Sequence, residues 1–123
     1  MAWHELEVNR DVDAKSGARI FRLKGALAGS EDSFAFLESV RQTLREKPAG
    51  IVINLADVDM VTSTGVGILA SCYTSAVNAG NCVALAQLQG KPRSVLKVVN
   101  LLAVIPEYES EQAAVEGVNR RRT

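Results

Sequence analysis

The sequence lacks an excess of either charge, because 14 lysines and arginines balance 14 aspartates and glutamates over its 123 residues. It therefore offers no broad basic surface of the kind that nucleic-acid binding needs. The one dense basic run lies at residues 120–122. We expect residues 119–123 to form a solvated basic tail after a single domain of residues 1–118, with phosphate or RNA contact as the alternative.

Long apolar runs are also missing, and none approaches the length that spans a bilayer. The first residues show no basic region followed by an apolar run, so we expect no signal peptide. Cysteine is scarce. Cys72 and Cys82 lie in apolar surroundings, which favours buried, reduced thiols over a disulfide. These absences predict a cytoplasmic protein without direct membrane insertion.

Residues suited to catalysis are few. The only histidine is His4, so a Ser-His-Asp arrangement is hard to build. Asp57 and Asp59, on a predicted loop, could act together in acid–base or metal chemistry, but such residues are more often turn formers. Residues 65–67 and 90–92 complete neither a dinucleotide nor a phosphate-loop motif, and no Cys-x-x-Cys metal spacing occurs. We expect no enzyme, no cofactor and no metal site.

What the sequence does contain is an alternation of short apolar runs and amphipathic segments, in a chain that is 47% hydrophobic and 23% charged. The patterns predict strands around residues 5–8, 18–24, 51–55, 82–86 and 105–108, and helices over 30–47 and 63–79, from 92 and from 110. A turn at residues 13–17 makes the first two strands a hairpin. This order predicts an α/β domain with a mixed, mostly parallel sheet of four to five strands and about four helices.

Apolar spacing also predicts which helix faces are buried. The expected buried stripe of the first helix is Phe34, Leu37, Val40 and Leu44. For the second helix it is Val66, Leu69, Ala70, Tyr73 and Val77. For the third helix it is Val95, Leu96, Val99 and Leu102. Ser30 and Ser110 are predicted N-caps, and Gly80 a predicted C-cap.

One segment, between the third predicted strand and the second predicted helix, carries most of the functional information, since sheets of this kind carry function beyond the ends of their strands. It contains three successive hydroxyl residues and two glycines: Thr62, Ser63, Thr64, Gly65 and Gly67. The unpaired N–H groups and the dipole of a helix start favour negative charge, so a phosphate on a hydroxyl there is tolerated. Two interpretations are open. Either the hydroxyls only cap the helix and the glycines only ease its packing, or the hydroxyls accept a phosphate and the glycines let another protein approach.

Residues 54–58 (Asn-Leu-Ala-Asp-Val) and 62–67 (Thr-Ser-Thr-Gly-Val-Gly) resemble the signature of the STAS domain, named for sulfate transporters and anti-sigma factor antagonists. That family typically reads D-L-S-x-V-x-x-[MI]-D-S-[ST]-G-[VL]-G there. Residues 25–27 (Gly-Ala-Leu) resemble the family's G-x-L after its second strand, and residues 100–114 resemble its ending. The pieces occur in order along nearly the whole chain, so the resemblance implies the STAS fold.

The resemblance is to the anti-sigma factor antagonist branch, a group of bacterial, cytoplasmic, non-catalytic regulators of transcription. In that branch the unphosphorylated protein binds an anti-sigma factor that is also a GHKL-type serine kinase, and the sigma factor is released. The kinase phosphorylates the serine that precedes [ST]-G, the antagonist dissociates, and a PP2C-type phosphatase resets it. The resemblance implies phosphorylation at Ser63 in a monomer or weak dimer. It implies partner binding by Thr62, Ser63, Thr64, Gly65, Gly67 and Leu27.

Two of the departures from the family pattern remove an acidic residue near Ser63. Thr62 stands where the family has Asp before the phosphoserine, and Ala28 stands where an acid often follows G-x-L. Both changes make this corner less acidic. Two alternatives follow: Thr62 or Thr64 is the acceptor, or the chain is an unswitched STAS subunit of a lipid transporter or scaffold of a signalling complex.

Overall fold

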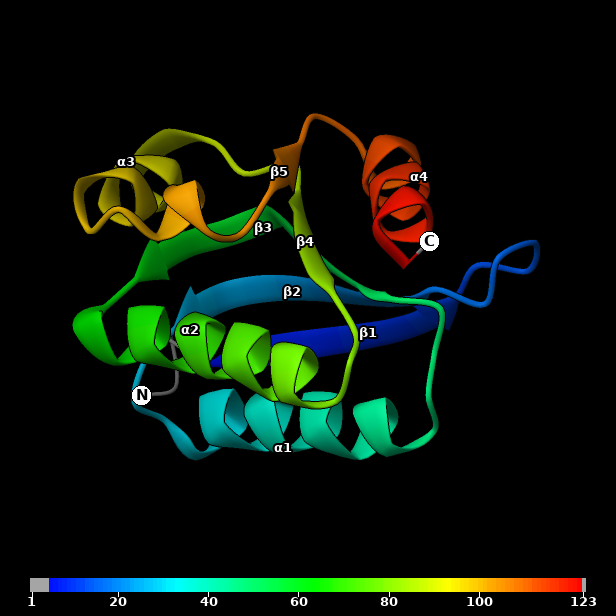
Figure 1. Cartoon of the computed structure of the whole chain (residues 1–123). Coiled ribbons are helices and arrows are strands. Elements are labelled where there is room, and N and C mark those ends of the chain that lie inside the picture. Colours follow the sequence, from blue (N-terminus) through cyan, green and yellow to red (C-terminus); the bar gives the residue numbers. More distant parts are fainter. Residues whose placement is uncertain (1–4, 123) are drawn as a thin grey trace.

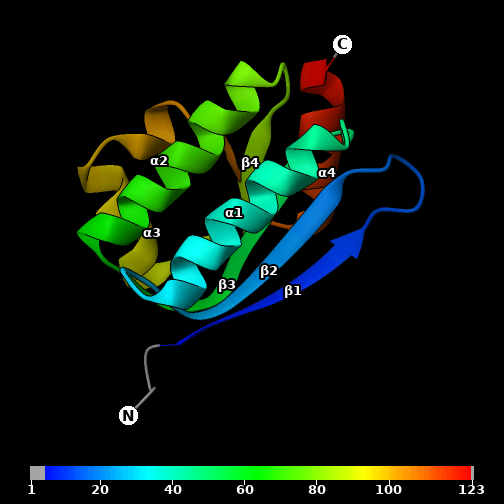
Figure 2. The same cartoon turned by 90° about the horizontal axis from the view of Figure 1, so that it is seen from below.

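The computed structural model describes residues 5–122 as one mixed sheet with helices packed on it (Figure 1). The five strands lie in chain order from β1 to β5. Both views place α1 and α2 on one face of the sheet and α4 on the other (Figures 1 and 2). The elements are β1 (Leu6–Val12), β2 (Arg19–Leu27), α1 (Glu31–Arg45), β3 (Ile51–Val61), α2 (Ser63–Asn78), β4 (Val83–Ala86), α3 (Gly90–Val98), the 3-10 helix η1 (Leu101–Ala103), β5 (Glu107–Tyr108) and α4 (Glu111–Arg122). This architecture confirms the predicted α/β fold.

The sheet has the predicted hairpin at one edge and parallel pairs elsewhere. β1 and β2 are antiparallel, and β2 to β5 pair in parallel. Asp13 shapes the hairpin turn, because its Oδ2 accepts hydrogen bonds from the N–H and the hydroxyl of Ser16 at 3.0 and 2.7 Å. β5 follows Pro106 and lies at the other edge of the sheet, where a proline is tolerated. The parallel strands bring the carboxyl ends of β2, β3 and β4 to one end of the sheet, where α1, α2 and α3 begin.

β3 is longer than predicted, and residues 57–61, expected to form a loop, are its second half. The reason is that β2 also extends and stays paired with β3 to the last residue of both strands. The pairing shifts register on either side of Gly25, whose φ of 104° suits glycine. Asp57 and Asp59 are therefore exposed strand residues, with the buried Val58 between them.

α1 buries a stripe that differs from the predicted one at a single point. Phe34 is 50% exposed, whereas Phe36 is buried edge-on against Phe21 with ring centroids 5.7 Å apart. The inward position beside them belongs to Ser33, whose hydroxyl accepts a hydrogen bond from a loop N–H at 3.0 Å. Ser33 and Thr43 are also buried, but they are polar, so the spacing of apolar residues does not predict their burial. The other predicted residues of the stripe are buried: Leu37, Val40 and Leu44.

α2 buries a face that is shifted by about one residue from the predicted stripe, so that Leu69 is buried as predicted while Val66 and Tyr73 are only partly buried. Its buried residues are Gly65, Ile68, Leu69, Cys72 and Ala76. Val77, predicted to be buried, is 51% exposed. Because the helix is apolar on most sides, spacing alone does not select a face. The small residues decide, since they allow the helix the closest approach to the sheet.

Both cysteines are free thiols, as predicted. Cys72 is fully buried, and burial raises the pKa of its thiol to about 12. Cys82 is only half-buried, and its Sγ donates to the carbonyl of Val118 at 3.5 Å.

α3 begins at Gly90, two residues before the predicted start at Pro92. Gly90 has a φ of 62°, which turns the chain into the helix after the preceding loop. Leu96 is buried as predicted, but Val99 is 49% exposed. The helix has already ended there, and Asn100, with a φ of 65°, turns the chain towards η1.

α4 begins at the predicted cap, because the Ser110 hydroxyl accepts a hydrogen bond from the N–H of Ala113 at 3.1 Å. The helix continues to Arg122, so the basic run predicted as a separate tail forms its last turn. The buried side of α4 consists of Ala114, Val115 and Val118. Gly50 permits this packing, since a Cβ there would lie 2.7 Å from the Val118 Cβ.

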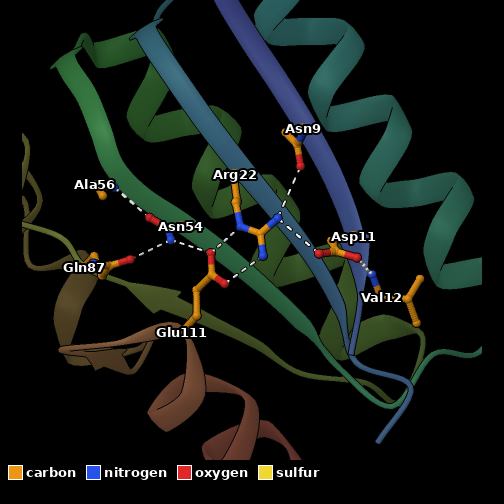
Figure 3. A network of polar contacts seen from close by, with 8 residues as sticks. All are labelled: Asn9, Asp11, Val12, Arg22, Asn54, Ala56, Gln87 and Glu111. Atoms are coloured by element: carbon orange, nitrogen blue, oxygen red, sulfur yellow. Dashed lines mark hydrogen bonds and ion pairs between the residues drawn. The ribbon is translucent and has the colours of Figure 1, made fainter. Parts of the chain in front are cut away.

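A polar network fixes the start of α4 to the sheet (Figure 3). Arg22 on β2 donates to both carboxylate oxygens of Glu111, at 2.6 Å from Nε and 3.0 Å from Nη2. Asn54 on β3 donates to the same carboxylate at 2.6 Å and to Gln87 Oε1 at 2.8 Å. Arg22 also donates to Asp11 on β1 at 3.2 Å. Hydrogen bonds from Arg22 and then Asn54 hold the pKa of Glu111 below its usual range, against the opposing effect of partial burial.

We expect this network to make the stability of the fold depend on pH. A carboxyl group whose pKa is lowered by folding stabilises the fold above its unfolded pKa, and this stabilisation is lost as the pH falls through the folded pKa. Glu111→Gln should lower the free energy of unfolding at neutral pH by only about 1 kcal/mol, because solvent reaches Arg22 and weakens the pair. Urea denaturation should show the difference from wild type shrinking below about pH 4.

Glu116→Gln is the matched control, because Glu116 lies on the exposed side of the same helix. An equal loss in both variants, or a Glu111→Gln loss that is unchanged in acid, would mean that the network does not carry this stabilisation.

Candidate functional site

The candidate site is the start of α2, where β3 ends and residues 62–67 turn into the helix. Thr62 is the N-cap, because its Oγ1 accepts a hydrogen bond from the N–H of Gly65 at 3.2 Å. The backbone N–H of Thr62 donates to the carbonyl of Leu27 at 3.1 Å. Thr62 therefore closes the helix end and ties it to the end of β2.

Ser63 and Thr64 are the first two residues of the helix, and both are exposed. Within residues 5–122, neither hydroxyl has a hydrogen-bond partner. They differ in their surroundings, because Thr64 lies against the loop between β2 and α1. A Cβ built on Gly29 in that loop would lie 3.7 Å from Thr64 Cγ2. Ser63 thus presents an exposed and unengaged hydroxyl, while Thr62 uses its hydroxyl as a cap.

The two glycines have different reasons to be there. Gly65 is buried, and a Cβ on it would overlap the carbonyl oxygen of Leu27 and lie 3.1 Å from Val61 Cγ1. Gly65 therefore allows the helix to rest on the end of β2. Gly67 is exposed, and a Cβ there would meet nothing within 4 Å. Packing within the domain explains Gly65 and leaves Gly67 unexplained.

Leu27 and the loop after it complete the site from the side of β2. The Leu27 side chain is fully buried, so this residue meets the site through its backbone carbonyl. In the loop, Ala28 donates its N–H to the Ser33 hydroxyl at 3.0 Å, and Gly29 is exposed beside Thr64. The contribution of Gly29 was not anticipated. It could have been predicted from the order of the strands, because the loops that follow neighbouring parallel strands lie side by side.

The electrostatic character of the helix start is set by its lack of acids. The first turn of α2 contains no acidic residue, so nothing in that turn offsets the positive end of the helix dipole. Thr62 and Ala28, which replace the acids of the family pattern, are half-buried and uncharged. A single dianion introduced here would dominate the local charge.

Within residues 5–122, no group of three or more His, Cys, Asp or Glu side chains could hold a metal ion. His4, the only histidine in the sequence, lies outside the described residues. A groove of about 670 Å³ is lined by the 13–16 turn and α4, away from residues 62–67. No helix in the described chain is long and apolar enough to cross a bilayer. What the site offers is an exposed helix start.

Solved structures of known proteins share this fold. An anti-sigma factor antagonist from Mycobacterium paratuberculosis matches with a TM-score of 0.78 and 19% identity, over 95% of this chain and 97% of that chain. The phosphorylated form of the Bacillus cell fate determinant SpoIIAA matches with a TM-score of 0.62 and 16% identity, over 91% and 99%. A sulfate transporter family protein from Wolinella succinogenes matches with a TM-score of 0.70 and 15% identity, over 89% of each chain. Identities this low establish the shared fold alone.

The amino-acid sequence identifies the family to which the chain belongs. No curated protein sequence matches the chain directly. The sequence model of the STAS domain, however, matches residues 9–114, a span that runs from β1 into α4 and contains the whole of the candidate site. The chain therefore belongs to the STAS domain family.

Proposed function

We propose that the chain is a non-catalytic anti-sigma factor antagonist, which binds an anti-sigma factor serine kinase through the start of α2 and is released when Ser63 is phosphorylated. The observation that carries the proposal is the exposed, unengaged hydroxyl of Ser63 at a helix N-terminus. The similarity in fold to an anti-sigma factor antagonist, and to a cell fate determinant solved in its phosphorylated form, supports it. The proposal places the protein in the bacterial cytoplasm, as a monomer or weak dimer.

The surroundings of the three hydroxyls favour Ser63 as the acceptor. Phosphorylation of Thr62 would attach a bulky group to the half-buried oxygen that caps Gly65. Phosphorylation of Thr64 would place the group beside the loop at Gly29. A phosphate on Ser63 meets neither obstacle, and the first turn of α2 contains no acid to repel it.

In the proposed cycle, the kinase transfers the γ-phosphoryl group of ATP to Ser63 Oγ, the hydroxyl proton is lost and ADP leaves. A PP2C-type phosphatase then hydrolyses the ester with water and releases inorganic phosphate.

The phosphate on Ser63 adds about −1.5 to −2 charges to the centre of the contact surface. Reversing a binding equilibrium from nearly all bound to nearly all free requires about 5.5 kcal/mol of differential affinity. An unpaired dianion held against the partner is a sufficient source of that energy, so the fold need not change.

In this proposal the partner contacts Thr62, Ser63, Thr64 and Gly67 directly. Gly65 and the backbone carbonyl of Leu27 hold the helix start in position from beneath. Gly67 lies one turn after Ser63, so the two share a face of the helix. A glycine at an exposed helical position costs roughly 1 kcal/mol relative to alanine. Close approach of a partner's backbone would account for that cost.

A second function is an unswitched STAS module in a lipid transporter or a signalling scaffold. The missing acids at Thr62 and Ala28 favour it, as does the likeness in fold to a sulfate transporter family protein. In this case the hydroxyls at residues 62–64 would only cap the helix. The two functions differ in whether Ser63 carries phosphate in the cell.

Mass measurement of the protein purified from its native cells separates the two functions. We expect a single added phosphate, about 80 Da, that peptide mapping assigns to Ser63.

Binding is measured against a panel of purified anti-sigma factor kinases from the same organism. Ser63→Asp should abolish binding to the cognate kinase, while Ser63→Ala should bind and resist phosphorylation. Phosphate at Thr62 or Thr64, or none in growing and stressed cells alike, would contradict the assignment.

The two glycines allow a matched pair of substitutions. Gly67→Ala should raise the free energy of unfolding by about 0.5–1 kcal/mol, because alanine is the better helix former and meets no neighbour. It should nevertheless weaken kinase binding. Gly65→Ala should instead destabilise the fold by about 1–3 kcal/mol, since its Cβ would overlap the Leu27 carbonyl. Thermal denaturation and titration calorimetry give the two quantities, and undiminished binding of Gly67→Ala would remove Gly67 from the interface.

A further inference from the structure

An exposed apolar surface at α3 and η1 is left without a role in the fold. It consists of Val98, Val99 and Val104, which are 84%, 49% and 49% exposed. We call it the valine surface. The core on this side is filled by Leu96 and Ile105, both fully buried, so the valines are not needed to close it. Residues 98–106 contain no charged side chain, and Asn100 is their one polar residue.

The valine surface lies at the same end of the sheet as the candidate site. Figures 1 and 2 both place α3 and η1 at the end where α2 begins. The core links the two places as well. Leu101 and Leu102 of η1 and Val66 in the first turn of α2 pack, partly buried, against the same core cluster.

The valine surface is too small to be an interface by itself. A stable interface covers about 800 Å² on each partner, and three partly exposed valines fall well short of that. They can serve only as part of a larger contact surface. The neighbouring exposed surface with its own reason to bind a protein is the start of α2.

Charge around the valine surface limits what can cover it. Lys91 and Lys97 are exposed on α3, and within residues 5–122 neither forms an ion pair. Arg93, between them, is already paired with Glu107 at 3.0 Å. The surface is therefore an apolar centre with unpaired positive charge at its rim. A complementary partner presents an apolar patch bordered by carboxylates.

We propose that the valine surface is the second part of the kinase-binding surface, and that it takes an apolar, acid-rimmed patch of the anti-sigma factor kinase. This inference rests on the proposed function. The start of α2 supplies the part of the interface that phosphorylation switches. The valine surface supplies constant apolar contact that the phosphate does not touch.

The test compares two valines of similar setting with the kinase that binds the wild-type chain. Val98→Glu removes apolar contact and sets a negative charge against carboxylates, so we expect at least a tenfold loss of affinity. Val77→Glu is the control, because Val77 is also exposed and also lies in the last turn of its helix, at the other end of α2. We expect its affinity to stay within about twofold of wild type. Hydrogen exchange of the wild-type complex should show protection at residues 98–104.

The outcomes separate this inference from the proposed function. Normal binding by Val98→Glu, with binding still abolished by Ser63→Asp, overturns the valine surface and leaves the proposed function standing. Equal losses for Val98→Glu and Val77→Glu overturn it too, as does sedimentation showing that the valines join two copies of this chain. A wild-type chain that binds no kinase overturns both proposals together.

Discussion

One backbone carbonyl, that of Leu27, fixes the start of α2 against the end of β2. It accepts the N–H of Thr62, and Gly65 rests on it without the Cβ that any other residue would bring. The Leu27 carbonyl oxygen is therefore a point of close contact between the end of β2 and the start of α2. Ser63 lies between the two residues held inward, and for that reason its own side chain faces solvent. The accessibility of the hydroxyl follows from backbone contacts and not from any property of serine.

The neutral character of this corner changes how a phosphate would act. In the family pattern, an acid beside the phosphoserine means that the unmodified surface is already negative. In this chain Thr62 and Ala28 carry no charge, so a phosphate on Ser63 would be the first negative charge within residues 62–66. The absence of those acids weakens the resemblance to the family at two positions. It does not weaken the physical basis for a charge-operated contact.

Much of the fold could be predicted from the sequence, because each signal was local. The turn at Asp13, the caps at Ser30, Thr62 or its neighbours and Ser110, and the order of strands and helices all depend on short segments. The errors arose where a partner decided the outcome. β3 continued through residues 57–61 because β2 continued beside it, and α2 turned its small residues inward because the sheet was close. At the site, the motif indicated Ser63, while the different roles of Gly65 and Gly67 emerged only from their neighbours in space.

The network at Glu111 makes the side chains at two distant positions of the chain depend on each other. Asn54 stands where the family pattern has Asp, and its amide group is the donor that the Glu111 carboxylate needs. An aspartate at position 54 would face that carboxylate as a second acceptor, with no proton between them at neutral pH. The amide at position 54 and the carboxylate at position 111 therefore form one electrostatic unit, although 57 residues separate them.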